Sequence, residues 1–133
     1  MKLTENTNSI LKLTDLHYNK ILFEANKQTD NENSCKLSRK ITDITDDDFN
    51  IELAFELITE SFFININLEA SFNIKCDNEV MKDRLIKNNT VAILFPYIRS
   101  EVTLITAQPG IEPIVIPPIN INKLIEDSEK ENS

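Results

Sequence analysis

Glycine, histidine and cysteine are scarce in this chain of 133 residues, and each scarcity argues against a class of site. The single glycine, Gly110, excludes a glycine-rich loop of the kind that cradles phosphate. The single histidine, His17, has no acidic or nucleophilic partner in pattern, so no catalytic triad is indicated. The two cysteines, Cys35 and Cys76, form no C-x-x-C motif and have no histidine nearby. That spacing argues against zinc and favours free thiols in a reducing cytoplasm.

Long apolar runs and an excess of positive charge are also missing. The longest apolar run, residues 91–98, is far shorter than the roughly 20 residues of a membrane span. The N-terminal residues 1–10 lack the basic and apolar segments of a signal peptide. The net charge of −8 opposes binding to nucleic acid or to anionic membranes. We therefore expect a cytoplasmic protein that neither binds nucleic acid nor inserts into a membrane.

Acidic residues form two patterns that resemble sites, and both favour a structural interpretation. Residues 45–48, Thr-Asp-Asp-Asp, are more typical of a solvated turn than of a cation site. Glu52 and Glu56 would lie about 13 Å apart along a strand, too far for a typical acid–base pair. The sequence thus predicts no metal site and no enzymatic activity.

The clearest pattern that is present is the alternation of apolar and polar residues typical of strands. Residues 51–57 and 62–68 each place apolar side chains on one face, which predicts an antiparallel hairpin turning at 58–61. Residues 13–25 alternate twice, out of phase, which predicts a strand with a bulge near Asn19 and Lys20. Residues 26–34 predict a polar loop, and residues 35–48 predict a strand of poor continuity.

Helical signals follow the strands. Asp77 or Asn78 can cap a short helix, and residues 87–90 predict an interruption. Thr90 can cap a second helix, which Pro109 and Gly110 stop near residue 108. This order predicts an α+β fold, a four-stranded antiparallel sheet with a long helix packed across it. We expect one domain over residues 1–125, with a short helix from Ile121, and an acidic disordered tail over 126–133.

The second helix raises the question of what covers it. Residues 91–98 are apolar on every side, and Pro96 lies inside the helix, where a proline costs roughly 3 kcal/mol. A sheet covers one side only, so we expect a second subunit to cover the other. The residues predicted at this oligomer interface are Val91, Leu94, Phe95, Ile98 and Val102.

Residues 111–121 contain three prolines and predict an extended apolar segment, neither a helix nor a central strand. Two interpretations remain open: the segment walls an apolar groove, or it merely covers the core.

Four stretches of the chain resemble the SecB family of export chaperones in the same order. They are KILFEA (20–25), FNIELAFELI (49–58), ILFPYIRSEV (93–102) and IPPININKL (116–124). The motif L-F-P-Y-x-R, from Leu94 to Arg99, is the most specific, and the resemblance spans about residues 13–125. It implies subunits that pair edge to edge and dimers that sandwich their long helices, giving a homotetramer as a dimer of dimers.

The resemblance also implies a function. Members bind unfolded polypeptides in apolar grooves and keep them soluble or export-competent, without a cofactor or ATP. The matching groove positions are Cys35, Leu37, Phe62, Ile64, Ile111, Ile114, Ile116 and Ile121.

In the family an acidic outer sheet face contacts the translocation motor SecA. The matching positions are Lys20, Glu24, Phe63 and Asn65, where Lys20 and Asn65 replace acids. We therefore expect weak SecA binding or none. The alternative implied by the resemblance is a chaperone that guards the antitoxin of a toxin–antitoxin–chaperone system. The sequence leaves open both this choice and the identity of the client.

Overall fold

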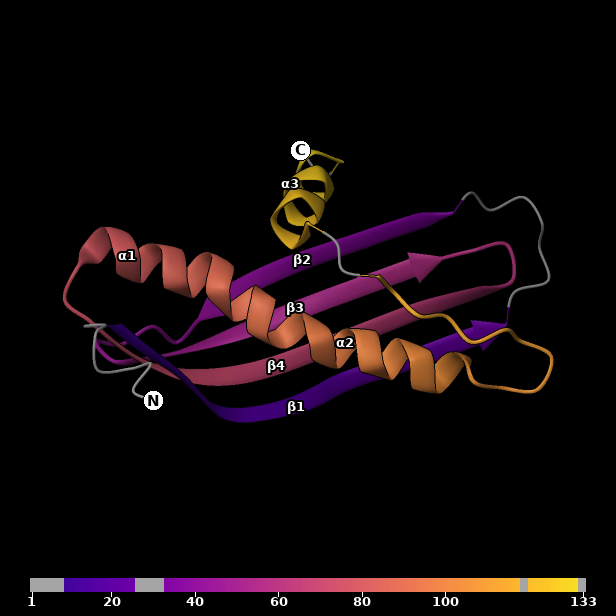
Figure 1. Ribbon diagram of the computed structural model, residues 1–133, viewed down its shortest axis with the longest axis horizontal. Coiled ribbons are helices and arrows are strands. Elements are labelled where there is room, and N and C mark those ends of the chain that lie inside the picture. The colour runs from indigo at the N-terminus through magenta and orange to yellow at the C-terminus, as the bar shows by residue number, and fades with distance from the viewer. Residues whose placement is uncertain (1–8, 26–32, 118–119, 132–133) are drawn as a thin grey trace.

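The computed structural model describes residues 9–25, 33–117 and 120–131, which form a two-layer arrangement of helices on one face of a sheet (Figure 1). The antiparallel strands are β1 (Ser9–Ala25), β2 (Ser34–Thr42), β3 (Asp48–Ile58) and β4 (Phe62–Cys76). Their order in the four-stranded sheet is β1-β4-β3-β2, so β1 and β2 are its edges.

The long helix runs diagonally across the sheet (Figure 1). It comprises α1 (Glu79–Arg84), a π-helical turn η1 (Leu85–Asn89) and α2 (Thr90–Thr106). A separate helix, α3 (Ile121–Glu131), packs beside the β2 edge. These elements confirm the predicted α+β fold, its four-stranded antiparallel sheet and its crossing helix.

The core lies between the sheet and α2. Every second residue of β4 from Phe62 to Ile74 is buried, as the alternation predicted. Phe49 stacks on Phe72 with ring centroids 5.5 Å apart. Phe55 meets Phe95 of α2 edge to face at 6.1 Å, which fixes the helix over β3. Burying one such side chain contributes about 1.5–3 kcal/mol.

The edge strands differ from each other in regularity. In β1 the register shifts between Tyr18 and Lys20, which confirms the predicted bulge, and again between Leu13 and Asp15. The strand of poor continuity predicted over residues 35–48 is regular as far as Thr42, where it pairs with β3 without a register shift, and breaks off over residues 43–47. The chain leaves β2 at Asp43, whose φ of 53° is left-handed and whose carboxylate accepts a hydrogen bond from Asn50 Nδ2 at 2.9 Å.

The start of the long helix partly matches the prediction. Asn78 caps α1, its side chain accepting the Met81 N–H at 3.0 Å. The interruption predicted at residues 87–90 is absent, because the π-helical turn carries the helix into α2. Thr90 is not a cap: it is buried, and its hydroxyl donates to the Ile86 carbonyl at 2.6 Å.

Helix α2 buries one face in the core of its own chain, which changes where a second subunit could lie; cover of its other face by a second subunit stays a prediction. The five residues predicted at the oligomer interface are at most 2% exposed in a single chain and belong to its own hydrophobic core: Val91, Leu94, Phe95, Ile98 and Val102. A second copy therefore cannot reach them without unpacking the core. Ile93, Tyr97 and Leu104 face outward instead. Pro96 has no N–H, so the carbonyl four residues before it lacks its usual helical hydrogen bond. Pro96 is exposed, and water can bond that carbonyl instead.

The C-terminal segment corrects a second expectation. Residues 126–131, predicted as disordered tail, belong to α3. Ile125 and Ser128 are buried, and Ser128 Oγ accepts the Leu37 N–H of β2 at 3.1 Å. Residues 132–133 lie outside the described part of the chain.

Candidate functional site

Segment 111–117, the described part of the proline-rich stretch, is held to α2 by hydrogen bonds. Arg99 Nε donates to the Ile116 carbonyl at 2.9 Å, and Thr103 Oγ1 donates to the Ile114 carbonyl at 2.8 Å. The Ile114 N–H donates to Thr106 Oγ1 at 2.9 Å. The side chains of α2 thus satisfy backbone groups that a strand partner would otherwise satisfy. The segment is fixed along the helix, on the way to α3 (Figure 1).

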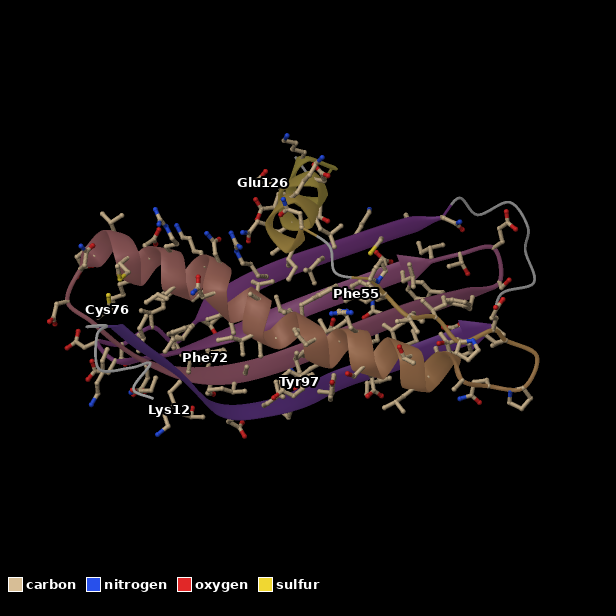
Figure 2. All side chains as sticks on the ribbon, in the orientation of Figure 1. Lys12, Phe55, Phe72, Cys76, Tyr97 and Glu126 are labelled. Atoms are coloured by element: carbon tan, nitrogen blue, oxygen red, sulfur yellow. The ribbon has the colours of Figure 1, made fainter. Side chains whose placement is uncertain are left out.

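A hollow of about 490 Å³ lies between this segment, the ends of β2 and β3, and α3. We call it the apolar groove, because most of its lining is apolar. Figure 2 shows Phe55, one of its lining residues, on the sheet between α2 and α3. The groove is lined by Cys35, Phe55, Leu57, Thr59, Ile114, Val115, Ile116, Pro117, Asn120, Lys123, Leu124 and Asp127.

A second hollow of about 400 Å³ adjoins the first, because Thr59 and Ile114 line both. We call it the polar extension, since it includes Glu60 and Glu112, both exposed. Its other lining residues are Asn33, Ser61, Phe62, Gly110 and Ile111. We call the two adjoining hollows together the depression; one part is mainly apolar, and the other includes the two glutamates.

The chemistry of the groove is that of a contact surface. Burial raises the pKa of the Cys35 thiol, which keeps it protonated and poorly nucleophilic. Cys35 and Cys76 are not joined in a disulfide, and Cys76 Sγ donates a hydrogen bond to the Asn78 carbonyl at 3.4 Å. In the described ranges no group of His, Cys, Asp and Glu side chains is arranged to hold a metal ion. None of the helices described here is long and apolar enough to cross a membrane.

The structure separates the eight predicted polypeptide-binding residues into two groups. Five line the depression: Cys35, Ile114 and Ile116 the apolar groove, and Phe62 and Ile111 the polar extension, which Ile114 also lines. The other three do not line it. Leu37 and Ile64 are fully buried, and Ile121 is half-buried against the core. Whether the five bind polypeptide stays a prediction.

Sequence reasoning missed several lining residues. Leu57 continues the alternating apolar face of β3, so its omission ignored an available signal. Leu124 and Asp127 are spaced three apart on α3, but the second was assigned to a disordered tail. Val115, 72% exposed, had no local signal because only the crossing of the segment over the groove places it there.

The four residues predicted to face a translocase share the sheet face opposite the helices. Glu24 is opposite Phe63, Lys20 is opposite Asn67, and Asn65 lies between Leu22 and Glu56. Asn65 Oδ1 is buried without a hydrogen-bond partner. The structure brings the four together but does not test their role.

Comparison with known proteins gives a family and a fold. A family model described as preprotein translocase subunit SecB matches residues 14–132. The structure resembles the Mycobacterium tuberculosis Rv1957 SecB-like chaperone, solved in complex with a ChAD peptide from the Rv1956 HigA1 antitoxin. The TM-score is 0.66 at 12% identity, covering 83% of this chain and 88% of that one.

A protein of unknown function from Streptococcus agalactiae gives a TM-score of 0.58 at 10% identity, covering 85% of this chain and all of the other. At these identities both structures show a shared fold and no more. The uncharacterized protein MJ0357 of Methanocaldococcus jannaschii is 46% identical over 48 residues. That match spans only about a third of either protein, 34% of this chain and 31% of the relative.

Proposed function

The chain belongs to the SecB family, and we propose that it is a molecular chaperone that holds non-native polypeptides in the apolar groove without ATP. The observation that carries this proposal is the groove itself: about 490 Å³, apolar and open to solvent in a single chain. A non-native chain exposes apolar side chains, and burying them against Leu57, Val115 and Leu124 is favourable whatever the sequence.

We assign no enzymatic step to the groove, because its one thiol is held protonated and the chemistry of its lining suits contact. We also propose that the chaperone works in the cytoplasm as a homotetramer.

A groove variant tests the proposal with a matched control. Val115 lines the groove and is 72% exposed, while Val80 on α1 is 73% exposed and does not line it. Val115→Asp places a charge where apolar client groups would be buried, so we expect about tenfold weaker suppression of aggregation. Val80→Asp should behave as the wild type. The measurement is light scattering of unfolded citrate synthase diluted into buffer with each variant.

A second readout locates the client. In a Cys76→Ser background, bound client should slow alkylation of Cys35, because Cys35 lines the groove. If wild-type protein leaves aggregation unchanged, the chaperone proposal is wrong. If Val80→Asp loses as much activity as Val115→Asp, the groove is not the binding site.

The second candidate function is protection of one antitoxin. It is favoured by the Rv1957 structure, a SecB-like chaperone solved with an antitoxin peptide on a similar fold. The two functions differ in client range: a dedicated chaperone should protect the antitoxin of a neighbouring toxin–antitoxin pair and leave unfolded citrate synthase unprotected. Comparing both clients in the same aggregation assay decides between them.

A further inference from the structure

Strand β2 has an open side. It is the last strand of the sheet, and helix α3 packs against it near Leu37 (Figure 1). An exposed edge presents unpaired backbone groups that can bind another extended chain.

The contact with α3 reveals which backbone groups face that side. Leu37 donates its N–H to Ser128 Oγ, at 3.1 Å, so this group points away from β3. Successive residues of a strand point their backbone groups to alternate sides, and β2 has no register shift. Cys35 and Arg39 therefore direct their N–H and C=O groups to the open side as well. Ser128 Oγ stands where the carbonyl of an added strand would accept.

The side chains of β2 indicate what would pair there. The strand carries Lys36, Arg39 and Lys40 and no acidic residue, in a protein whose net charge is −8. On its closed side, Lys36 is opposite Glu56 and Lys40 is opposite Glu52.

On the helix-covered face, Cys35 and Leu37 are opposite Leu57 and Phe55. Strand β3 thus shows the complement of β2: acidic residues on the outer face and apolar residues on the other.

We propose that the open edge of β2 binds an extended client segment of alternating apolar and acidic residues, which pairs as an added strand. Its apolar side chains enter the groove beside Cys35 and Leu57, and its acidic side chains face Lys36 and Lys40. To bind, it moves helix α3 away from the middle of β2, which frees the buried Leu37 N–H from Ser128. The inference rests on the proposed chaperone function and adds its binding mode and the chemistry of the client.

The same charges exclude a second copy as the occupant. Pairing β2 with β2 of another molecule would bring cationic strands together, and like charges on adjacent strands are unfavourable. The overall negative charge opposes an acidic client only weakly, because salt screens exposed charges beyond about 8 Å at 0.15 M. The adjacent lysines therefore dominate the local interaction.

Peptides that copy residues 49–57, the sequence of β3, test the proposal with the full-length protein. We expect the fluorescein-labelled peptide to bind about tenfold more tightly than the same peptide with lysine at both glutamate positions. The Lys36→Glu, Lys40→Glu double variant should reverse that preference. Fluorescence anisotropy at 0.15 M salt measures both affinities.

N-methylation tests the backbone pairing directly. Only alternate residues of an added strand direct their N–H groups to β2, so N-methyl groups on one alternate set should abolish binding and on the other set should leave it within about twofold. Ser128→Ala should tighten binding about fivefold, because α3 loses its acceptor for the Leu37 N–H.

Equal affinity of the two N-methylated peptides would overturn the proposal, since the groove would then hold side chains alone. Failure of all these peptides to bind, while unfolded citrate synthase is still protected, also overturns it and leaves the chaperone function standing. Loss of both activities refutes the proposed function itself.

Discussion

Tyr18 connects the edge strand β1 to the long helix through a single hydroxyl. It donates a hydrogen bond to the Tyr97 carbonyl at 3.1 Å. Burial is the main reason that the pKa of Tyr18 is raised above 10.0, and the nearby Glu101 carboxylate and Tyr97 add to the effect. Each of these favours the neutral phenol, which is also the form that can donate the bond.

The raised pKa predicts a loss of stability in alkali. As the pH rises through about 10, Tyr18 loses its proton in the unfolded chain first, so the folded state becomes less stable relative to it. Below that pH the phenol is protonated in both states and the contribution is fully present. In Tyr18→Phe this dependence should vanish, and the variant should lose about 0.5–1.5 kcal/mol at neutral pH with the hydrogen bond.

Urea unfolding of both proteins between about pH 8 and 11 measures the difference. A stability difference between wild type and Tyr18→Phe that stays constant over this range would contradict the assigned cause, because other titrating groups are common to both proteins.

Single residues also show where sequence reasoning stops. Asn78 could be assigned as a cap because the N–H that it accepts is three residues away. Ser128 could not be recognised, because its partner Leu37 is 91 positions distant. A hydrogen bond between residues close in sequence can be predicted from the sequence, whereas one between distant residues can be recognised only once the fold is known.

Among the elements, strands were predicted best. The alternation in β3 and β4 identifies both the hairpin and its buried face, because a strand with one covered face must alternate. The continuity of the long helix was missed, because tertiary contacts support it: Arg39 of β2 donates to the Lys87 carbonyl in the π-helical turn at 2.7 Å. The prediction also ended helix α3 too early, because the helix is stabilised by buried residues that pack on β2.

The candidate site was predicted only in part, because the alternation of residues along a strand gives incomplete information. Alternation assigns a residue to a face of the sheet but not to a position along it. Leu37 and Ile64 lie on the correct face and are covered there by other side chains. Leu57 lies one residue from the end of β3, is only half-buried by other side chains and lines the groove.

The outer face of the sheet gives a prediction about SecA. Lys20 and Asn65 leave this surface less acidic than the resemblance requires, so we expect weak SecA binding. The double variant Lys20→Asp, Asn65→Glu should gain about tenfold, since each exposed charge pair contributes at most about 1 kcal/mol. Titration of SecA at low salt measures both proteins.

A matched control lies at the other end of the same face. Lys12 and Asn73 are opposite each other on β1 and β4, so Lys12→Asp with Asn73→Glu makes the same change of charge elsewhere. If this pair gains as much as the first, net charge and not the predicted surface governs the contact. Nanomolar binding of the unmodified protein to SecA would contradict this prediction and would support a role in export.

For the molecule as a whole, we now predict that subunits contact each other through the outward side of α2. The residues first predicted at the oligomer interface fill the core of one chain, so the outward side of α2 takes their place. Ile93, Tyr97 and Leu104 are exposed there at helical spacings of four and seven. Exposed apolar side chains that share one helix face are typical of an interface.

Substitutions on the two faces of α2 should therefore have opposite consequences. Leu104 is 67% exposed, so Leu104→Asp should dissociate the assembly while each chain stays folded, because a charge would enter the subunit contact unpaired. Ile98 is fully buried on the opposite, core-facing side of α2, so Ile98→Asp should unfold the chain at a cost of several kcal/mol. Val80→Asp on α1 changes an equally exposed apolar residue away from this face and should alter neither property. Light scattering at micromolar concentration, with urea unfolding of each variant, separates the outcomes. A monomeric wild-type protein, or a Leu104→Asp variant that keeps the wild-type mass, would show that α2 is not the contact between subunits.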